Sequence, residues 1–139
     1  MDIYTDGSCN TQNLLGAWGA VILTPSSEKI VLSGKEVNTT HQRMELLAVI
    51  KALRFVGTGS VTVYSDSQYV TGLVGRKLGA KGFMTKKGAA IRNADLVREF
   101  LALEAAMEVT FVKVKAHGEG VPFNVEVDRL VRGLVRERV

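Results

Sequence analysis

The chain has 139 residues, of which 46% are hydrophobic and 23% charged, a composition that suits one globular domain with a buried core and excludes a disordered or fibrous chain. No stretch approaches the roughly 18 uninterrupted apolar residues of a membrane-spanning helix, and Asp2 and Asp6 stand where a signal peptide needs basic and then apolar residues. The single cysteine, Cys9, excludes an internal disulfide framework and a cysteine-based zinc site. We therefore expect a cytoplasmic protein of one domain that uses no membrane.

The charge is unevenly distributed along the chain. The 18 basic residues outnumber the 14 acidic ones, which gives a net charge of +4. Between Asp66 and Asp95 there is no acidic residue, but six basic residues occur there: Arg76, Lys77, Lys81, Lys86, Lys87 and Arg92. Alone, such a stretch is typical of a solvated loop. Beside a cluster of carboxylates it favours a phosphate backbone as the binding partner.

The first half of the chain predicts three strands and a helix. Residues 3–6, 18–24 and 29–37 read as strands with short connections, which indicates an antiparallel meander. Residues 42–56 then follow a helical period and are apolar nearly all round, so this helix is expected to be buried. Gly57 and Gly59 end it.

The second half predicts two more strands separated by helices. Residues 61–65 form a β-branched strand, residues 68–74 a short helix, and residues 94–107 a longer helix with Asn93 as its N-cap. Residues 109–115 alternate as a last strand, and a helix begins near residue 125. This order predicts an α/β fold with a mixed sheet of about five strands, three antiparallel and then two parallel, flanked by helices.

Four acidic residues stand in positions where a carboxylate is costly: Asp6, Glu45, Asp66 and Asp128. Asp6 and Asp66 follow predicted strands, and if those strands are adjacent and parallel the two side chains meet at one edge of the sheet. Glu45 lies on the helix that is apolar nearly all round.

Each acidic residue also has a purely structural explanation. Asp6 and Asp66 suit turns, and Asp66 could cap the next helix. Glu45 could pair with Arg43 or lie at the rim of the buried helix. Asp128 could form a surface ion pair with Arg129 or Arg132.

Taken together, the four carboxylates predict a metal site. If they converge without bases, they repel one another and raise their pKa values unless cations bind. Oxygen ligands without cysteine suit Mg²⁺ or Mn²⁺ better than Zn²⁺. Two such ions can support in-line hydrolysis of a phosphodiester, so the sequence points to a nuclease.

Four motifs carry these acids in chain order: Tyr4-Thr5-Asp6-Gly7-Ser8-Cys9; Gln42-Arg43-Met44-Glu45-Leu46; Tyr64-Ser65-Asp66-Ser67-Gln68-Tyr69-Val70; and Ala116-His117-Gly118 leading to Asn124 and Asp128-Arg129-Leu130. In these residues nearly the whole chain resembles the type 1 ribonuclease H family, which hydrolyses the RNA strand of RNA/DNA hybrids. The resemblance implies a single ribonuclease H catalytic domain over residues 1–139, with the family's ribonuclease H-like fold. It also implies a monomer without an obligate protein partner.

The resemblance assigns roles to individual residues. It implies that Asp6, Glu45, Asp66 and Asp128 are ligands of two Mg²⁺ or Mn²⁺ ions, with 5′-phosphate and 3′-hydroxyl ends as products. His117 matches the mobile-loop histidine that assists proton transfer or product release, a role that an imidazole suits.

The implied substrate contacts fall into three groups, one for the RNA strand, one for a DNA phosphate pocket and one for a basic protrusion. The RNA strand is expected to contact Cys9, Gln12, Gln42 and Gln68. The DNA phosphate pocket is expected to consist of Thr40 and Asn93, and the basic protrusion to contribute Lys81, Lys86 and Lys87. Some have structural alternatives, because Thr39 and Gln42 fit a capping box and Asn93 fits an N-cap.

The chain departs from the family pattern at several positions. Gln12 stands where many relatives have asparagine, His41 where an asparagine or similar amide is common, Asn38 where some have arginine, and Val125 where glutamate is frequent. The basic stretch is short and lacks tryptophan, with Phe83 its one aromatic residue, and the loop of residues 118–123 is one residue longer than usual. Two alternatives therefore stay open: another nuclease of the wider superfamily, and a module that binds hybrids without cutting them.

Overall fold

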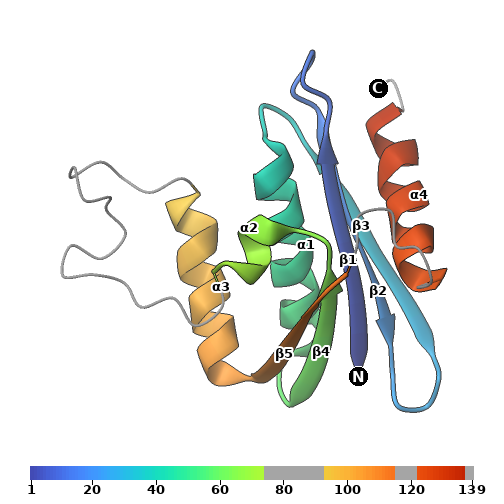
Figure 1. Cartoon of the computed structure of the whole chain (residues 1–139), viewed down its shortest axis with the longest axis vertical. Helices are drawn as coiled ribbons and strands as arrows, with labels where there is room; N and C mark the ends of the chain where they lie inside the picture. The colour runs from blue at the N-terminus through green and yellow to red at the C-terminus, as the bar shows by residue number, and fades with distance from the viewer. Residues whose placement is uncertain (74–92, 115–121, 137–139) are drawn as a thin grey trace.

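The computed structural model describes residues 1–73, 93–114 and 122–136. A five-stranded mixed sheet runs through it in the order β3-β2-β1-β4-β5 (Figure 1). The strands are β1 (Asp2–Cys9), β2 (Gly16–Leu23), β3 (Lys29–Glu36), β4 (Ser60–Ser65) and β5 (Glu108–Lys113). The first three pair antiparallel, whereas β4 is parallel to both β1 and β5. The predicted α/β, ribonuclease H-like fold is confirmed, with its mixed sheet of five strands, three antiparallel and then two parallel.

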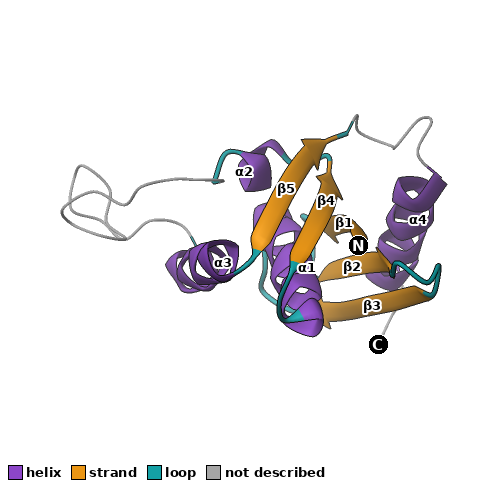
Figure 2. Cartoon of the chain, turned by 90° about the horizontal axis from the view of Figure 1, so that it is seen from below, coloured by secondary structure: helices purple, strands orange, loops and turns teal. Residues whose placement is uncertain are grey.

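Helices cover both faces of the sheet: α1 (His41–Val56), α2 (Gln68–Thr71), α3 (Ala94–Ala106) and α4 (Pro122–Arg136). Figure 2 shows α1, α2 and α3 on one side and α4 on the other. None of the helices in the described part of the chain is long and apolar enough to span a bilayer.

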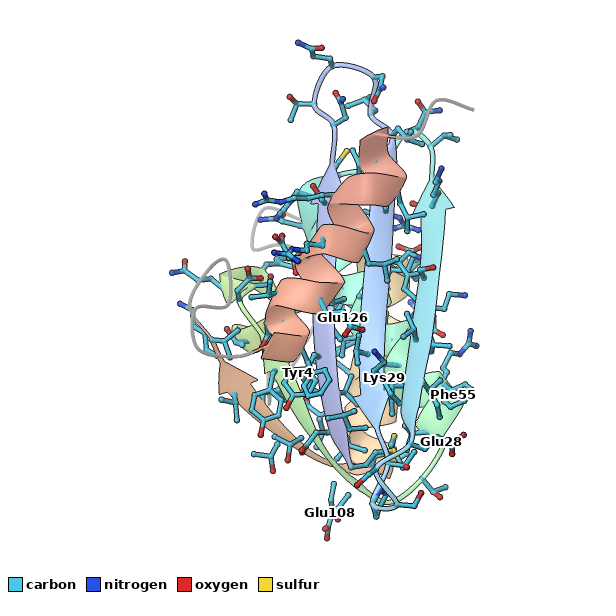
Figure 3. All side chains as sticks on the ribbon, turned by 90° about the vertical axis from the view of Figure 1, so that its right-hand side faces the viewer. Tyr4, Glu28, Lys29, Phe55, Glu108 and Glu126 are labelled. Carbon is cyan, nitrogen blue, oxygen red and sulfur yellow. The ribbon has the colours of Figure 1, made fainter. Side chains whose placement is uncertain are left out.

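The strand alternation explains the two-sided packing. In β1, Ile3 faces the large core that α1 and α3 complete, and the next residue, Tyr4, faces the cluster that α4 covers. Tyr4 stacks on Tyr64 of β4, with ring centroids 4.7 Å apart, and contacts Phe123 at the start of α4. Lys29 of β3 and Glu126 reach toward one another and form an ion pair of 3.1 Å that ties α4 to the sheet (Figure 3).

Several predicted element boundaries are wrong by a few residues. The last strand begins at Glu108 and ends at Lys113, and the last helix begins at Pro122, since proline is favoured in the first turn of a helix. The short second helix ends at Thr71 instead of residue 74. Asp6 is not at the end of its strand, because β1 continues to Cys9 through its pairing with β2.

The helix caps also differ from the sequence prediction. Thr40, not Thr39, caps α1, since its hydroxyl accepts a hydrogen bond from the backbone N–H of Arg43 at 3.1 Å. Asn93 does occupy the N-cap position of α3, but it is left-handed (φ 57°) and its side chain makes no capping bond. Its amide instead donates to the hydroxyl of Tyr69 at 3.3 Å.

Candidate active site

The sheet opens between β1 and β4, and two carboxylates lie at the opening. The two strands pair in parallel up to Tyr4 and Tyr64. Asp6 and Asp66 each come two residues later, so they occupy equivalent positions on neighbouring chains of the sheet. Asp6 stays in β1 by pairing with Gly19, while β4 ends at Ser65. The carboxyl ends of parallel strands are where open α/β sheets place ligands.

The third carboxylate, that of Glu45, comes from α1, and Gly7 allows it to come close. A Cβ atom at Gly7 would overlap the backbone of Met44 and the nitrogen of Glu45. Because glycine has no side chain, α1 can lie directly against β1 at this point. The residue after Asp6 therefore determines how near Glu45 approaches it.

Asp6, Glu45 and Asp66 form one cluster. Each offers a carboxylate oxygen, and the three oxygens lie within 4.8 Å of one another. Asp6 and Glu45 are buried, with exposed fractions of 9% and 3%. Asp128, on α4, shares a side-chain hydrogen bond with Asp6. Four acidic residues from β1, α1, α4 and the end of β4 thus converge beside the sheet opening.

The two buried acids of the cluster, Asp6 and Glu45, hold protons more tightly than ordinary carboxylates, because their pKa values are raised. Burial first, and then the charges of Glu45 and Asp66, raise the pKa of Asp6 to about 9. The pKa of Glu45 is also raised, first by burial and then by Asp66, while the hydrogen bond from His41 opposes the rise. Positive charge placed among these oxygens would remove the repulsion.

The donor set suits a hard divalent cation. All the converging groups are carboxylates, which Mg²⁺ and Mn²⁺ prefer as ligands. One oxygen of Glu45, Oε2, is buried and accepts no hydrogen bond from the described residues. A buried carboxylate oxygen without a donor is costly, and coordination to a cation would satisfy it.

The arginines nearest the cluster in sequence do not pair with its buried residue Glu45. The predicted alternative of an Arg43–Glu45 pair is wrong, because the guanidinium of Arg43 binds Glu36 and Asp95. The ion pair expected for Asp128 is present, with Arg132 Nε 3.2 Å from Asp128 Oδ2. Asp128 therefore contacts both a base and Asp6.

A pocket of about 310 Å³ lies beside the cluster. Its lining comes from the first turn of α1 and from the β4–α2 connection: His41, Gln42, Glu45, Asp66, Ser67, Gln68 and Tyr69. A larger pocket, of about 450 Å³, is formed by residues around Met1, Leu23 and Phe123 and contains none of the four acids. The smaller pocket is therefore the one that borders the carboxylate cluster.

The residues expected to contact substrate are only partly brought together. Gln42 and Gln68 line the pocket. Cys9 ends β1, and its thiol contacts the carbonyl of Thr39 at 3.4 Å, while Gln12 is exposed in the β1–β2 loop. Thr40 caps α1, and Asn93 begins α3. His117, Lys81, Lys86 and Lys87 lie outside the described residues, so their predicted roles stay predictions.

His41 lines the pocket, although its sequence pattern did not assign it a role. The imidazole Nε2 of His41 lies 3.1 Å from Oε1 of Glu45. The i, i+4 spacing on a helix was the available signal, since such residues are neighbours on one face.

The fold and the acid cluster together define an α/β protein with a group of carboxylates that could hold a divalent cation beside a pocket. A sequence model described as RNase H matches residues 1–135. Among curated relatives, the ribonuclease H of Moorella thermoacetica is 38% identical over 96% of this chain and 90% of its own length. Those of Cupriavidus pinatubonensis and Anaplasma marginale are each 39% identical, over 92% and 99% of this chain and 90% and 91% of their own lengths.

The chain therefore belongs to the ribonuclease H family and is a nuclease of the hydrolase class. The family acts on RNA/DNA hybrids and depends on divalent metal ions, in agreement with the donor set of the acid cluster.

Proposed function

We propose that this chain is an endonuclease that hydrolyses the RNA strand of RNA/DNA hybrids with two Mg²⁺ or Mn²⁺ ions, leaving 5′-phosphate and 3′-hydroxyl ends. The convergence of Asp6, Glu45 and Asp66 within 4.8 Å carries the proposal. We further propose that residues 1–139 act as a single catalytic domain, as a cytoplasmic monomer without an obligate protein partner.

In this proposal the four acids hold the metal ions. Asp6 and Asp66 are central, because they come from adjacent parallel strands and face the same opening. Glu45 adds its buried oxygen, and Asp128 is the most loosely held ligand because Arg132 competes for it. When bound, two such ions promote attack of water on the scissile phosphate and stabilise the leaving oxygen.

The side chains beside the acids bind and orient the hybrid. Gln42 and Gln68 line the pocket next to Glu45 and Asp66, where their amides can donate to and accept from 2′-hydroxyl groups, the feature that separates RNA from DNA. Cys9 and Gln12 are proposed to contact the same strand. Thr40 and Asn93 are proposed to bind a DNA phosphate, and Lys81, Lys86 and Lys87 to add electrostatic affinity.

Proton transfer is assigned to His117. An imidazole with an ordinary pKa near 6.5 can accept and release a proton at neutral pH. Its match to the family's mobile-loop histidine supports this role. Substituting His117 with alanine should lower kcat while hybrid binding is retained.

A binding-only module is the main alternative, and the acid cluster argues against it. Buried carboxylates that repel one another weaken the fold and do not help a protein that only grips a polyanion. The decisive experiment is cleavage of a labelled RNA/DNA hybrid beside duplex DNA, duplex RNA and single-stranded RNA, with Mg²⁺, Mn²⁺ or EDTA. We expect metal-dependent cutting of the RNA strand of the hybrid alone. Hybrid binding without cutting under both metals would refute the proposal.

A further inference from the structure

His41 is the first residue of α1, and Glu45 lies one turn later on the same face. The imidazole Nε2 of His41 is 3.1 Å from Oε1 of Glu45, within hydrogen-bond distance. A carboxylate can only accept, so the imidazole N–H donates. This contact joins a residue at the mouth of the pocket to one of the acids in the cluster.

The two partners differ sharply in exposure. The side chain of His41 is 62% exposed, whereas that of Glu45 is 4% exposed. The histidine therefore reaches inward from the solvent to a carboxylate that has almost no access to water. Loss of this donor would leave Oε1 of Glu45 in the same position as Oε2, which is buried without a hydrogen bond from the described residues.

Arg43, the cationic residue closest to Glu45 in sequence, does not replace His41. Its Nε donates to Glu36 at 2.7 Å, and its two Nη atoms donate to Asp95 at 3.1 and 2.9 Å. The guanidinium is held away from Glu45 by these contacts. Within the described part of the chain, the hydrogen bond from His41 is therefore the contact that orients the carboxylate of Glu45.

We propose that His41 is a positioning residue, whose Nε2–H holds Oε1 of Glu45 so that the second oxygen, Oε2, stays available as a metal ligand. The inference rests on the proposed function, since it requires that the acid cluster binds metal. Hydrogen-bond partners of metal-binding side chains fix their orientation and commonly change metal affinity by about 10- to 100-fold when removed. In this role His41 acts through Glu45 and not by contact with the phosphate.

The test is calorimetric titration of MnCl₂ into the metal-free protein. His41→Ala removes the donor. His41→Gln keeps an N–H donor at nearly the same reach, so it should rescue binding if a neutral hydrogen bond is what matters. Lys51→Ala, a substitution at an exposed position on the same helix, serves as the control. Asp66→Asn, which removes a proposed metal ligand, shows the calorimetric signal of a protein with a disabled metal site.

We expect His41→Ala to weaken Mn²⁺ binding about tenfold or more, while His41→Gln stays within about threefold of wild type and Lys51→Ala is unchanged. Hybrid affinity measured in EDTA should change less than about twofold in His41→Ala, His41→Gln and Lys51→Ala. Far-UV circular dichroism checks folding, and His41→Met, similar in length but without a donor, replaces the alanine variant if that chain does not fold.

Three results would overturn the inference. The first is wild-type Mn²⁺ affinity in His41→Ala, and the second is a loss in His41→Gln as large as in His41→Ala, which would make the imidazole itself the ligand. The third is a matching loss of hybrid affinity in EDTA, which would make His41 a substrate contact. If instead the wild-type protein neither binds Mn²⁺ nor cuts the hybrid, the proposed function fails as well, so the two failures are distinguishable.

Discussion

The guanidinium of Arg43 donates two parallel hydrogen bonds to the carboxylate of Asp95, from Nη1 to Oδ1 at 3.1 Å and from Nη2 to Oδ2 at 2.9 Å. Its Nε also donates to Glu36 at 2.7 Å. One side chain thus connects the start of α1, the end of β3 and the start of α3. Thr40 and Asn93, the two residues proposed to bind a DNA phosphate, lie at the two helix starts that Arg43 joins.

Arg43→Lys should lower stability modestly and weaken hybrid binding more clearly. Lysine keeps the charge but cannot form the two-pronged contact with Asp95. Asp95 is largely exposed, so we expect a loss of about 1 kcal/mol in the free energy of unfolding, measured with urea. The KM for the hybrid should rise while kcat changes little.

The matched control for that change is Arg54→Lys. Arg54 contacts Glu99 through Nε at 2.7 Å on an exposed part of the same helix. We expect Arg54→Lys to lower the free energy of unfolding by less than about 0.5 kcal/mol and to leave the KM for the hybrid unchanged. Equal effects of the two substitutions on KM would contradict the proposed role of Arg43.

The metal-free protein should become less stable as pH rises. Asp6 keeps its proton up to about pH 9 in the folded chain but loses it near the ordinary value of 3.8 when unfolded. Between these values the folded state binds more protons, so the free energy of unfolding falls with increasing pH. The raised pKa of Glu45 acts in the same direction. We expect Tm in EDTA to decrease from pH 5 to pH 9.

Mg²⁺ should raise Tm more at pH 8.5 than at pH 5.5, because a cation binds the deprotonated cluster. Asp6→Asn removes the titrating group, so it should flatten both the pH dependence and the Mg²⁺ effect. Thermal unfolding over this pH range checks both. A pH slope unchanged in Asp6→Asn would mean that another group causes it.

Asp66→Asn should abolish cleavage and preserve binding. The amide keeps the shape of the side chain but loses the charge that the proposed metal ions require. We expect at least about a hundredfold lower single-turnover rate, in line with the loss of one electrostatic contribution to catalysis. Hybrid affinity in EDTA, measured by fluorescence anisotropy, should stay within about threefold. Full cleavage by this variant would eliminate the proposed site.

Gly7→Ala should damage both the fold and the metal site. The added methyl group overlaps the backbone of α1 at Met44 and Glu45, so the helix must move away from β1. We expect a loss of about 2 kcal/mol or more in unfolding free energy together with weaker Mn²⁺ binding.

Gly133→Ala is the control for Gly7→Ala. A Cβ at this exposed position in α4 meets nothing within 4 Å, and alanine has the higher helix propensity. The change should therefore raise stability by up to about 1 kcal/mol and leave Mn²⁺ binding unaltered. Equal metal affinities in the two alanine variants would contradict the role given to Gly7.

Neutralising Lys81, Lys86 and Lys87 together should weaken hybrid binding. Each lysine that binds a phosphate contributes to counterion release, so each neutralised lysine should make the salt dependence of binding shallower by up to about one unit of slope. Binding isotherms at several salt concentrations measure this. Unchanged affinity and slope would show that the stretch contributes nothing to binding.

Much of the fold follows from local patterns in the chain. The β-branched run in residues 61–65, the helical period in residues 42–56 and the order of the strands are short-range features, and they were enough to predict the mixed sheet. The four acids were identifiable because each stands among apolar residues or directly after a predicted strand, where an unpaired charge is unfavourable. The sequence by itself therefore determined the architecture and the candidate ligands.

Tertiary structure alone decided which side chains meet. The sequence favours Thr39 as the cap, since it forms a capping-box pattern with Gln42, but Thr40 caps α1 because the backbone of the β3–α1 connection places its hydroxyl at the N–H of Arg43. Arg43 pairs with Asp95, a residue far along the chain, which leaves Glu45 to His41. Partner choice depends on rotamers and on the approach of distant elements, such as the contact of α1 with β1 at Gly7. Local sequence patterns do not encode these long-range distances.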